Sequence, residues 1–341
     1  MAGAEVGGAE AFFVRLATAL AASDIEQRTV IRRHGERSAA LRRSGVRTRE
    51  AAFGGGLDFH TRRHFADEIA AFKPDVVLTW MNRATRFCPK PTRRRAFVHA
   101  ARLGGYYNLK YYRRCHHLIA NTKGIADYLR AQGWPPDRVH HLPNFVSAER
   151  AEAALRSDTH TPDDAPLLFA AGRLHRNKGF DVLLAALGDL PDCTLWLAGS
   201  GPEEAALKAI ARKCGTEARV RFLGWRDDVA ALYAAADVFV CPSRHEPLGN
   251  VVVEAWAQGL PVVATASAGP RELIEEETSG VLVPIDDAAA LAAGVRRVLD
   301  SRDLQDRLLA GGAAAFEAGF TEAAVVRRYR RFFDTIAGRA A

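Results

Sequence analysis

Short apolar runs alternate with helix-like stretches along nearly the whole chain, and this alternation restricts the fold more than any other feature of the sequence. Such alternation is typical of parallel sheets that are covered by helices. The rhythm stops once, over residues 143–166, which carry no strand signal and end in polar residues. It resumes at residue 167, so we expect an α/β protein with two consecutive Rossmann-like domains.

The boundaries that follow are an N-terminal domain over 1–146, a linker over 147–166, a C-terminal domain over 167–319, and a last helix with its tail over 320–341. The strands expected in the first half are 28–33, 75–80, 96–100, 117–122 and 138–143. Those expected in the second half are 167–173, 194–199, 219–224, 237–243, 261–265 and 280–284. Ligands of such sheets bind at the carboxyl ends of the strands, so residues that follow strands are the candidates for a site.

Length and composition restrict the class of protein further. A chain of 341 residues, 48% of them hydrophobic, is long enough for two packed cores. It has no apolar run of roughly 18 residues, and its first ten residues include acids and lack the basic start of a secretory signal. The five cysteines form no CxxC pair, which argues against a disulfide framework or a zinc site. We therefore expect a cytoplasmic protein.

Charge is distributed unevenly between the two halves. Residues 1–150 hold 26 Lys and Arg against 13 Asp and Glu, a net of +13, whereas the rest holds 21 against 27, a net of −6. A basic surface of this kind attracts the phosphates of lipid, lipopolysaccharide or nucleic acid. The alternative is a solvated arginine-rich face without a partner. The aromatic and basic stretch 106–115 has the same two interpretations, an acceptor contact or the packing face of a helix.

Two segments of the second half predict a phosphate site. In GRLHRNKGFDVLLAAL (172–187), Arg173 and Lys178 flank a loop between a strand and a helix, where two cations can neutralise a diphosphate. In LAGSGPEEAAL (197–207), a strand leads through Gly-Ser-Gly-Pro into an acidic helix start. The second segment lacks the GxGxxG spacing, so a dinucleotide site is poorly supported.

A third segment, HEPLGNVVVEAWAQGLPVVAT (245–265), carries Glu246 and Glu254 eight residues apart around a turn that enters a helix. The N–H groups of a helix start suit phosphate, but two carboxylates repel it. Sugar hydroxyls on either side of a diphosphate fit both facts. Ordinary surface glutamates are the alternative.

The order and spacing of these segments, followed by VRFLGW, DVFVCPS and SGVLVP, resemble the retaining GT4-type glycosyltransferases of the group 1 family, which have the GT-B fold. The likeness spans about residues 167–300. The first half resembles the family more faintly, through EVGGAE (5–10), His99 and LPNFV (142–146).

The resemblance implies roles for matching residues. Arg173 and Lys178 would bind the diphosphate of the donor and stabilise it as the leaving group. Glu246 would face the transferred sugar, and Glu254 would accept hydrogen bonds from the ribose. Five further contacts with the donor are implied: the backbone at Leu248, Gly249 and Asn250 beside the phosphates, Gly224 near the base, His99 at the sugar, Gly7 and Gly8 near the diphosphate, and Asn144 at a less defined place.

The reaction implied is transfer of a sugar from a nucleotide-diphosphate donor to an acceptor hydroxyl with retention, with no metal and no cofactor. The implied GT-B fold has two domains facing across a cleft and a last helix that crosses back to the first domain. The basic first half favours an anionic glycan or glycolipid acceptor, such as lipopolysaccharide, with peripheral contact at the inner membrane. We expect no nucleic-acid partner, because no helix-turn-helix, RRM or zinc pattern is present.

One departure from the family concerns the start of the chain. Relatives have a full strand before the Gly-Gly loop, whereas only residues 1–6 precede Gly7 here. We expect a start codon that has been placed too late, or a shortened chain. Two alternatives to a transferase remain: a non-catalytic GT-B scaffold of a glycan assembly complex and a sugar-nucleotide epimerase. His60 and His64 have the spacing of metal ligands on a helix, but no third ligand is evident.

Overall fold

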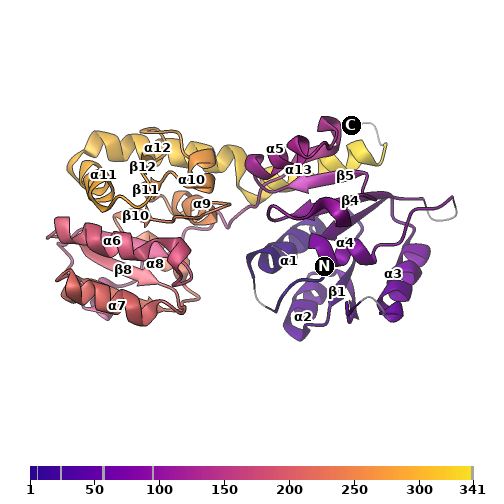
Figure 1. Cartoon of the computed structure of the whole chain (residues 1–341), viewed down its shortest axis with the longest axis horizontal. Helices are drawn as coiled ribbons and strands as arrows, with labels where there is room; N and C mark the ends of the chain where they lie inside the picture. Colours follow the sequence, from indigo (N-terminus) through magenta and orange to yellow (C-terminus); the bar gives the residue numbers. More distant parts are fainter. Residues whose placement is uncertain (6, 24, 56–57, 94–95, 339–341) are drawn as a thin grey trace. The chain divides into compact units, whose positions relative to one another are not determined.

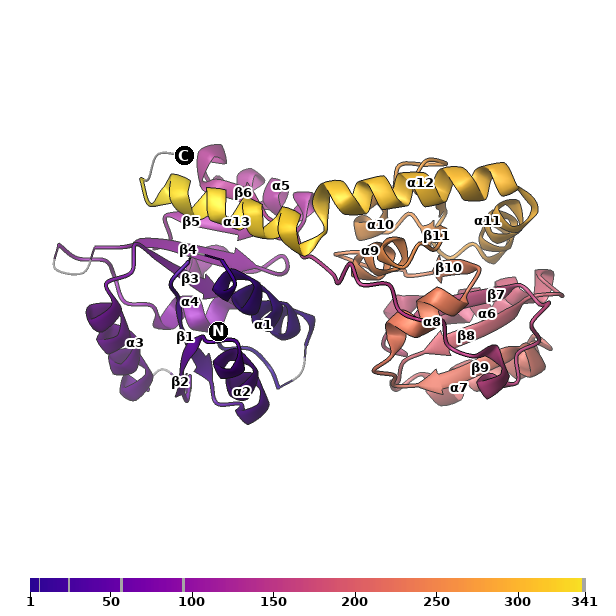
Figure 2. The same cartoon turned by 180° about the vertical axis from the view of Figure 1, so that it is seen from behind.

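The computed structural model describes residues 1–5, 7–23, 25–55, 58–93 and 96–338 (Figures 1 and 2). The chain divides into two compact units, the first made of Met1–Phe145 and Glu322–Ala341 and the second of Val146–Thr321. Each unit contains parallel strands with helices packed on both faces, which confirms the prediction of two Rossmann-like domains.

The second unit is built on one six-stranded parallel sheet of order β12-β11-β10-β7-β8-β9. Its strands are β7 (Leu167–Ala171), β8 (Thr194–Ala198), β9 (Val220–Gly224), β10 (Val238–Cys241), β11 (Val262–Thr265) and β12 (Val281–Val283). Its helices are α6 (Phe180–Ala186), α7 (Glu204–Lys213), α8 (Val229–Ala235), α9 (Asn250–Ala257), α10 (Ala268–Leu273), α11 (Ala288–Asp300) and α12 (Arg302–Gly319). Side chains of α6, α7 and α11 form the core on one face of the sheet, and side chains of α8 and α9 form it on the other. The central strand β7 is buried at its first four residues because it is covered on both faces.

The first unit holds a four-stranded parallel sheet of order β3-β4-β5-β6 and a separate parallel pair β1-β2. Its strands are β1 (Arg28–Arg32), β2 (Arg47–Ala51), β3 (Val76–Trp80), β4 (Val98–Leu103), β5 (His117–Ala120) and β6 (Val139–His141). Its helices are α1 (Gly8–Ala21), α2 (Gly35–Arg43), α3 (Phe59–Phe72), α4 (Met81–Phe87), α5 (Lys123–Ala131) and α13 (Glu322–Ile336). The last helix, α13, packs in this unit: Val325, Tyr329 and Phe332 share a core with Phe12 of α1.

Residues 147–166, expected to be a linker, belong to the second unit. The amide of Ala154 donates to the carbonyl of Ala231 over 3.0 Å. The Arg156 guanidinium bonds Asp237 and the carbonyl of Ala235, each over 3.0 Å. These contacts hold the segment against α8 and the start of β10. No sequence pattern in the segment indicates these contacts.

Within the described ranges, none of the helices is both long and apolar enough to cross a membrane. The same ranges contain no group of three or more His, Cys, Asp or Glu side chains arranged to hold a metal ion.

Candidate functional site

The centre of the six-stranded sheet brings two predicted residues together. The chain leaves β7 toward β8 on one side, and it later returns to place β10 on the other side of β7. Between two such strands the connections diverge, and this is where ligands bind in open α/β sheets. Lys178 lies in the loop after β7, and Glu246 lies in the loop after β10.

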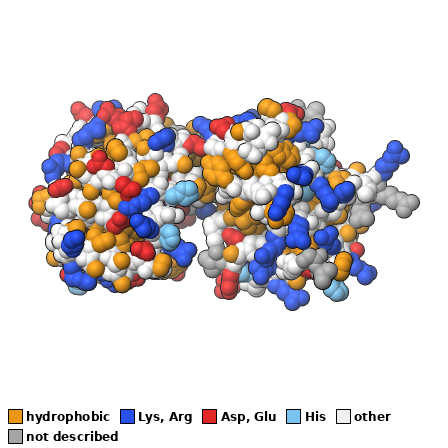
Figure 3. Space-filling model, in the orientation of Figure 1, with side chains coloured by type: hydrophobic (Ala, Val, Ile, Leu, Met, Phe, Trp, Pro, Cys, Tyr) orange, Lys and Arg blue, Asp and Glu red, His pale blue; other side chains and the backbone are white. Residues whose placement is uncertain are grey.

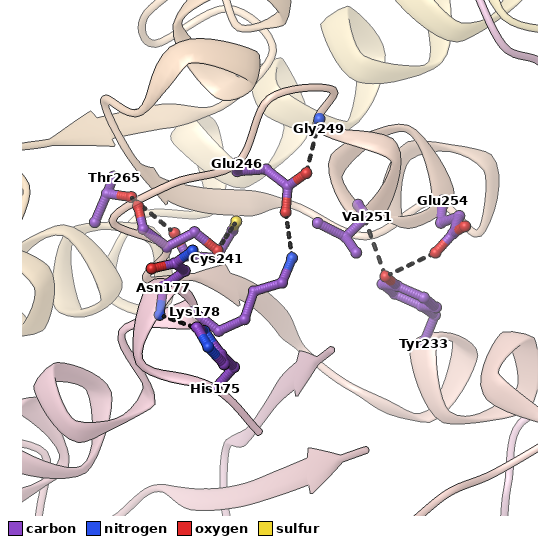
Figure 4. A network of polar contacts seen from close by, with 11 residues as sticks. His175, Asn177, Lys178, Tyr233, Cys241, Glu246, Gly249, Val251, Glu254 and Thr265 are labelled. Atoms are coloured by element: carbon purple, nitrogen blue, oxygen red, sulfur yellow. Dashed lines mark hydrogen bonds and ion pairs between the residues drawn. The ribbon is translucent and has the colours of Figure 1, made fainter. Parts of the chain in front are cut away.

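Lys178 and Glu246 form an ion pair at this point. The Lys178 Nζ lies 2.5 Å from Glu246 Oε2, and the two side chains are 22% and 9% exposed. Figure 4 shows the lysine side chain reaching from its loop to the glutamate. The second carboxylate oxygen of Glu246 accepts a hydrogen bond of 3.2 Å from the amide of Gly249. Glu246 thus connects the half-buried ammonium of Lys178 to the start of α9.

Glycines allow the loops to approach this closely. Gly179 has a φ of 65°, and a Cβ there would lie 2.1 Å from the carbonyl oxygen of Pro242. Gly249 has a φ of 70°, and its Cβ would lie 2.5 Å from Leu273 Cδ1. Both φ values favour glycine. Any side chain at Gly179 would push the loop that carries Lys178 away from the end of β10.

The start of α9 carries the remaining predicted residues of this unit. Gly249 is its N-cap, Leu248 precedes it, and Asn250 is its first residue. Glu254 lies one turn further on, where Tyr233 Oη donates to its Oε2 over 3.4 Å and to the carbonyl of Val251 over 3.1 Å. Burial raises the pKa of Tyr233 well above its usual value, and the nearby Glu254 carboxylate adds to this shift. Tyr233 is therefore a neutral donor that orients Glu254.

The loop after β10 is fixed by an ion-pair network that the sequence did not reveal. Arg244 donates to both carboxylate oxygens of Asp181 over 2.7 Å, and it also contacts Asp286 over 2.5 Å. These bonds hold the pKa of Asp181 below its usual value and that of Arg244 above it. The bidentate geometry restrains Arg244, two residues before Glu246. The three residues lie far apart in the chain, so only the fold brings them together.

Arg173 follows β7 and Gly224 ends β9, at the same edge of the sheet, with the end of β8 between them. Arg173 is exposed, and among the described residues it has no hydrogen bond or ion pair. Gly224 ends β9 with a φ of 65°, and its carbonyl accepts from the amide of Gly199 over 2.7 Å. Trp225 follows with 72% of its surface exposed. A flat exposed ring beside the site is available for stacking.

In the first unit, Gly7 is the N-cap of α1, and Gly8 is its first residue. A Cβ on Gly7 would lie 2.4 Å from Glu10 Oε2, whereas Gly8 has open space around it. Asn144 is 8% exposed, and its Oδ1 accepts a bond of 2.5 Å from Arg102. Arg102 itself is 2% exposed at the end of β4, a buried cation that sequence reasoning missed.

His99 does not lie at the end of a strand. The predicted strand 96–100 is wrong in extent, because β4 continues to Leu103 and His99 is only its second residue. The ring is 2% exposed and contacts Thr79 Oγ1 over 3.0 Å. Burial, with a smaller contribution from His116, lowers the pKa of His99 to about 4. A neutral ring buried near the amino edge of the sheet favours a structural role.

Two family models together match nearly the whole chain. The model of glycosyl transferases group 1 matches residues 152–313, and that of glycosyltransferase family 4 matches residues 6–150. Lipopolysaccharide core biosynthesis glycosyltransferase LpsE of Rhizobium meliloti is 37% identical over 330 residues, which cover 95% of this chain and 94% of the relative. The chain belongs to the group 1 glycosyltransferases. It is therefore a glycosyltransferase that uses a nucleotide sugar, in a family that retains the anomeric configuration.

A second relative and a solved structure are also similar to this group 1 glycosyltransferase. LpsD of the same organism, also named as a lipopolysaccharide core biosynthesis glycosyltransferase, is 36% identical over 334 residues, covering 96% of this chain and 95% of the relative. The crystal structure of Anabaena Alr3699/HepE in complex with UDP and glucose has a TM-score of 0.80 at 19% identity, and 98% of each chain is covered. The likeness confirms the GT-B fold that the sequence resemblance implied.

Proposed function

We propose that this glycosyltransferase transfers a sugar to a hydroxyl of an anionic glycan or glycolipid of the cell envelope, such as a lipopolysaccharide core, at the cytoplasmic face of the inner membrane. The observation that carries the donor half of this proposal is the Lys178–Glu246 pair between β7 and β10, beside the start of α9. The acceptor half rests on the charge of the first unit and on the printed names of the relatives LpsE and LpsD.

The donor diphosphate would lie between the two loops. Lys178 and the exposed Arg173 supply two cations, and the amides at Leu248, Gly249 and Asn250 supply donors at a helix start. In the structure the Gly249 amide and the Lys178 ammonium are both bonded to Glu246. A bound diphosphate would take over both donors, and Glu246 would then be free to accept hydrogen bonds from the sugar hydroxyls.

Charge stabilisation would accelerate the reaction. As the bond between the sugar and the diphosphate breaks, negative charge grows on the leaving phosphate oxygen, and Lys178 and Arg173 would stabilise it. Glu254, oriented by Tyr233, would hold the ribose by accepting its hydroxyl protons in hydrogen bonds. The leaving phosphate would accept the proton of the acceptor hydroxyl on the same face of the sugar, which accounts for retention.

A binding experiment tests the donor site. Ligand-observed NMR would be recorded with UDP-, GDP- and ADP-sugars on the parent protein, on Lys178→Ala and on Glu254→Ala. We expect one nucleotide to bind, and each variant to weaken binding by about 10-fold or more, since each removes a charged hydrogen bond. Lys208→Ala is the matched control, because Lys208 forms an ordinary surface pair with Glu204 on α7. Equal binding by all four proteins would contradict the proposed site, and no binding by the folded parent would favour the scaffold alternative.

The acceptor side predicts attraction to anionic membranes. Figure 3 shows Lys and Arg side chains gathered on the visible face of the first unit. Arg113 and Arg114 of the first unit are exposed, and no ion pair is found for either among the described residues. Each basic residue near an anionic surface contributes roughly 1 kcal/mol, so replacing both by serine should weaken binding about 30-fold.

Sedimentation with phosphatidylglycerol vesicles measures this at low and at high salt. Binding should fall as salt rises, and phosphatidylcholine vesicles should not bind. The control replaces Arg302 and Arg307, two exposed arginines of α12 in the second unit, by serine. Vesicle binding that does not change with salt would count against an electrostatic contact through the first unit. An equal loss of binding in the control variant would also count against it.

A further inference from the structure

Arg244 joins segments of the second unit that lie far apart in the chain. Its guanidinium donates to both carboxylate oxygens of Asp181 over 2.7 Å and to the carbonyl of Arg176 over 2.9 Å. Its Nε lies 2.5 Å from a carboxylate oxygen of Asp286. Arg176 lies in the loop after β7, Asp181 in α6 and Asp286 in the turn after β12. These contacts, here named the Arg244 network, connect the loop after β10 with the segments that follow β7 and β12.

The Arg244 network holds the turn that carries Lys178. The 3-10 turn Arg176–Lys178 lies between β7 and α6, and Arg244 binds the carbonyl of its first residue. A main-chain bond of 3.0 Å, from the amide of His245 to the carbonyl of Asn177, connects the same two loops. The distance between the two partners of the ion pair in the candidate site therefore depends on where Arg244 is held.

The two aspartates determine what the charge of Arg244 can bind. Arg244 and Asp181 form a bidentate pair in which the side chains are 24% and 37% exposed, and Asp286 occupies the remaining Nε. A guanidinium whose two terminal nitrogens are occupied in this way cannot bind a phosphate in the same geometry. Arg173, by contrast, is exposed, and no hydrogen bond or ion pair is found for it among the described residues. Arg173 is thus available to a ligand, whereas Arg244 is engaged with the protein.

The opposite edge of the same sheet has a comparable arginine. Arg156 bonds Asp237, directly before β10, over 3.0 Å, and it bonds the carbonyl of Ala165, shortly before β7, over 3.1 Å. The side chain of Arg156 is 18% exposed, close to the 24% of Arg244. An arginine therefore connects β7 and β10 at each end of the two strands. The bonds of Arg156 lie at the edge away from the candidate site, which makes it a matched control for Arg244.

We propose that Arg244 is a positioning residue of the sugar-transfer site, which sets the spacing between Lys178 and Glu246. Its two aspartate partners keep its charge away from the donor diphosphate. A diphosphate that replaces Glu246 as the partner of Lys178 would then enter between loops that are already held in place, so little freedom is lost on binding. The inference rests on the proposed function for the role of Lys178, but the spacing of the ion pair can be measured without any substrate.

NMR of the lysine ammonium groups tests the spacing. Lysines are rare in the chain, so the signal of Lys178 can be assigned as the one that is absent from Lys178→Arg. The variant Glu246→Gln gives the signal of Lys178 without its charged partner. We expect Arg244→Ala to shift the Lys178 signal toward that position, and Arg156→Ala to leave it as in the parent protein. A Lys178 signal that is the same in Arg244→Ala and in the parent would overturn the proposal.

A conservative variant guards against a general loss of folding. Arg244→Lys keeps the positive charge, but a single ammonium cannot reproduce the bidentate bonds and the bond to the Arg176 carbonyl together. We expect it to shift the Lys178 signal in the same direction as Arg244→Ala does. A parent-like signal in Arg244→Lys would show that charge alone suffices, and it would overturn the positioning role.

Binding of inorganic pyrophosphate, followed by phosphorus NMR, separates positioning from direct binding. Arg244→Ala should bind it about 10-fold more weakly, because the bonds from Lys178 lose their alignment, and Arg156→Ala should bind it as the parent does. Asp181→Asn loosens the Arg244 network but leaves the cation in place, so it should also weaken binding. If Arg244 itself bound phosphate, its release from Asp181 would strengthen binding instead, and that result would overturn the proposal.

A double variant corrects for the charge that Asp181→Asn removes. The same substitution in the Arg244→Ala background gives the effect of that charge alone, and the difference between the two backgrounds is the part that acts through Arg244. If no protein, the parent included, binds pyrophosphate, the donor site of the proposed function is wrong. The Lys178 signal still decides in that case whether Arg244 sets the spacing of the ion pair.

Discussion

The pair β2-β1 and the strands β3-β4-β5 of the first unit follow the same order as β9-β8 and β10-β11-β12 of the second, but among the described residues only the second unit has a strand, β7, between the two groups. There β7 is buried between β8 and β10, and the loop that follows it is held in place by contacts of the main chain. In the first unit the corresponding place, between β1 and β3, is a cavity. The segment that leads from Met1 into α1 is held by a bond of Met1 to β1 and by side chains. The comparison teaches that a central strand does two tasks, completing the core and fixing the loop where ligands bind.

In the first unit, the segment before α1 is held mainly by bonds to side chains. The buried Glu10 accepts from the amide of Ala4 over 2.7 Å. Arg37 donates to the carbonyls of Ala4 and Glu5 over 3.1 and 3.0 Å. In the second unit the loop after β7 is tied by main-chain bonds, for example from the amide of Leu174 to the carbonyl of Ser200 over 2.9 Å. We therefore expect the second unit to be the more rigid of the two.

The largest difference should come from truncating a residue at the centre of each sheet. Phe169 in β7 is fully buried, with its ring 4.8 Å from that of Tyr233, so Phe169→Ala should cost about 3–5 kcal/mol of unfolding free energy. Val77 in β3 is half-buried and lines the cavity, so Val77→Ala should cost about 1 kcal/mol or less. Urea unfolding of both variants measures the difference. Similar losses would mean that the cavity is closed in solution.

A smaller effect is expected from glycine substitutions in the two loops. At Gly179 a φ of 65° and the nearby Pro242 carbonyl oppose any side chain, so Gly179→Ala should cost about 3 kcal/mol and displace Lys178. Gly8 has open space around it at the start of α1, so Gly8→Ala should change stability by less than about 1 kcal/mol. Thermal unfolding measures the stability change of both variants. NMR titration with the nucleotide sugar measures donor affinity, which should fall if Lys178 is displaced. A Gly179→Ala protein with unchanged stability and donor affinity would refute this account of the loop.

The buried amino group of Met1 makes the first unit sensitive to pH. Burial, and to a lesser degree Arg37, lowers its pKa from 8.0 to about 5. The unfolded chain therefore binds more protons between pH 5 and pH 8, so stability should rise as the pH rises through that window. Three pH units correspond to about 4 kcal/mol at most. The amine lies beside the cavity, where water reduces the penalty, so we expect about 2 kcal/mol.

The pH effect can be separated from histidine titration. His99 and His140 also have pKa values lowered to about 4 by burial, but in the unfolded chain they titrate near pH 6.5. Unfolding free energies between pH 7 and pH 8, in protein whose mass shows that Met1 is retained, therefore report mainly on the amine. Protein whose amino terminus has been acetylated should lose this slope, because an amide replaces the amine. A slope that persists there would assign it to another group.

The second sheet was the more predictable from sequence. Its buried parallel strands read as continuous apolar runs, so the predicted 167–173 and 261–265 differ from β7 and β11 by two residues or fewer. In the first unit β2 was missed, because its sequence RTREA has no apolar run and alternates exposed arginines with half-buried residues. It is held by its ladder to β1 and by a bond between Thr29 and Thr48 of 2.9 Å. These contacts of β2 depend on the folded structure, so the sequence of the strand itself shows no pattern for them.

The residues of the candidate site also differ in how well the sequence predicted them. Lys178, Glu246, Gly249 and Glu254 lie in short segments whose glycines and spacing indicate a helix start beside charges, and the structure places them at one edge of the sheet. Arg102 could not be found in this manner. Its burial depends on the rings of Phe12 and Trp80, at 4.8 and 4.6 Å, and on partners far away in the chain. A lone arginine in a strand gives no sign of those partners before the fold is known.

The smallest difference concerns one buried hydroxyl in each unit. Tyr329 Oη accepts a bond of 3.0 Å from the buried Arg102 guanidinium, so Tyr329→Phe leaves a charged donor without one acceptor and should cost about 1.5–3 kcal/mol. Tyr233 Oη instead donates to the Val251 carbonyl and, over a long 3.4 Å, to Glu254. Tyr233→Phe should therefore cost only about 1 kcal/mol, although it should weaken donor binding by removing a hydrogen bond that orients Glu254. Urea unfolding of both variants, followed by NMR titration with the nucleotide sugar, tests this pair. If Tyr233→Phe were the more destabilising and bound the donor unchanged, Tyr233 would be a core residue and Glu254 would need no orienting partner.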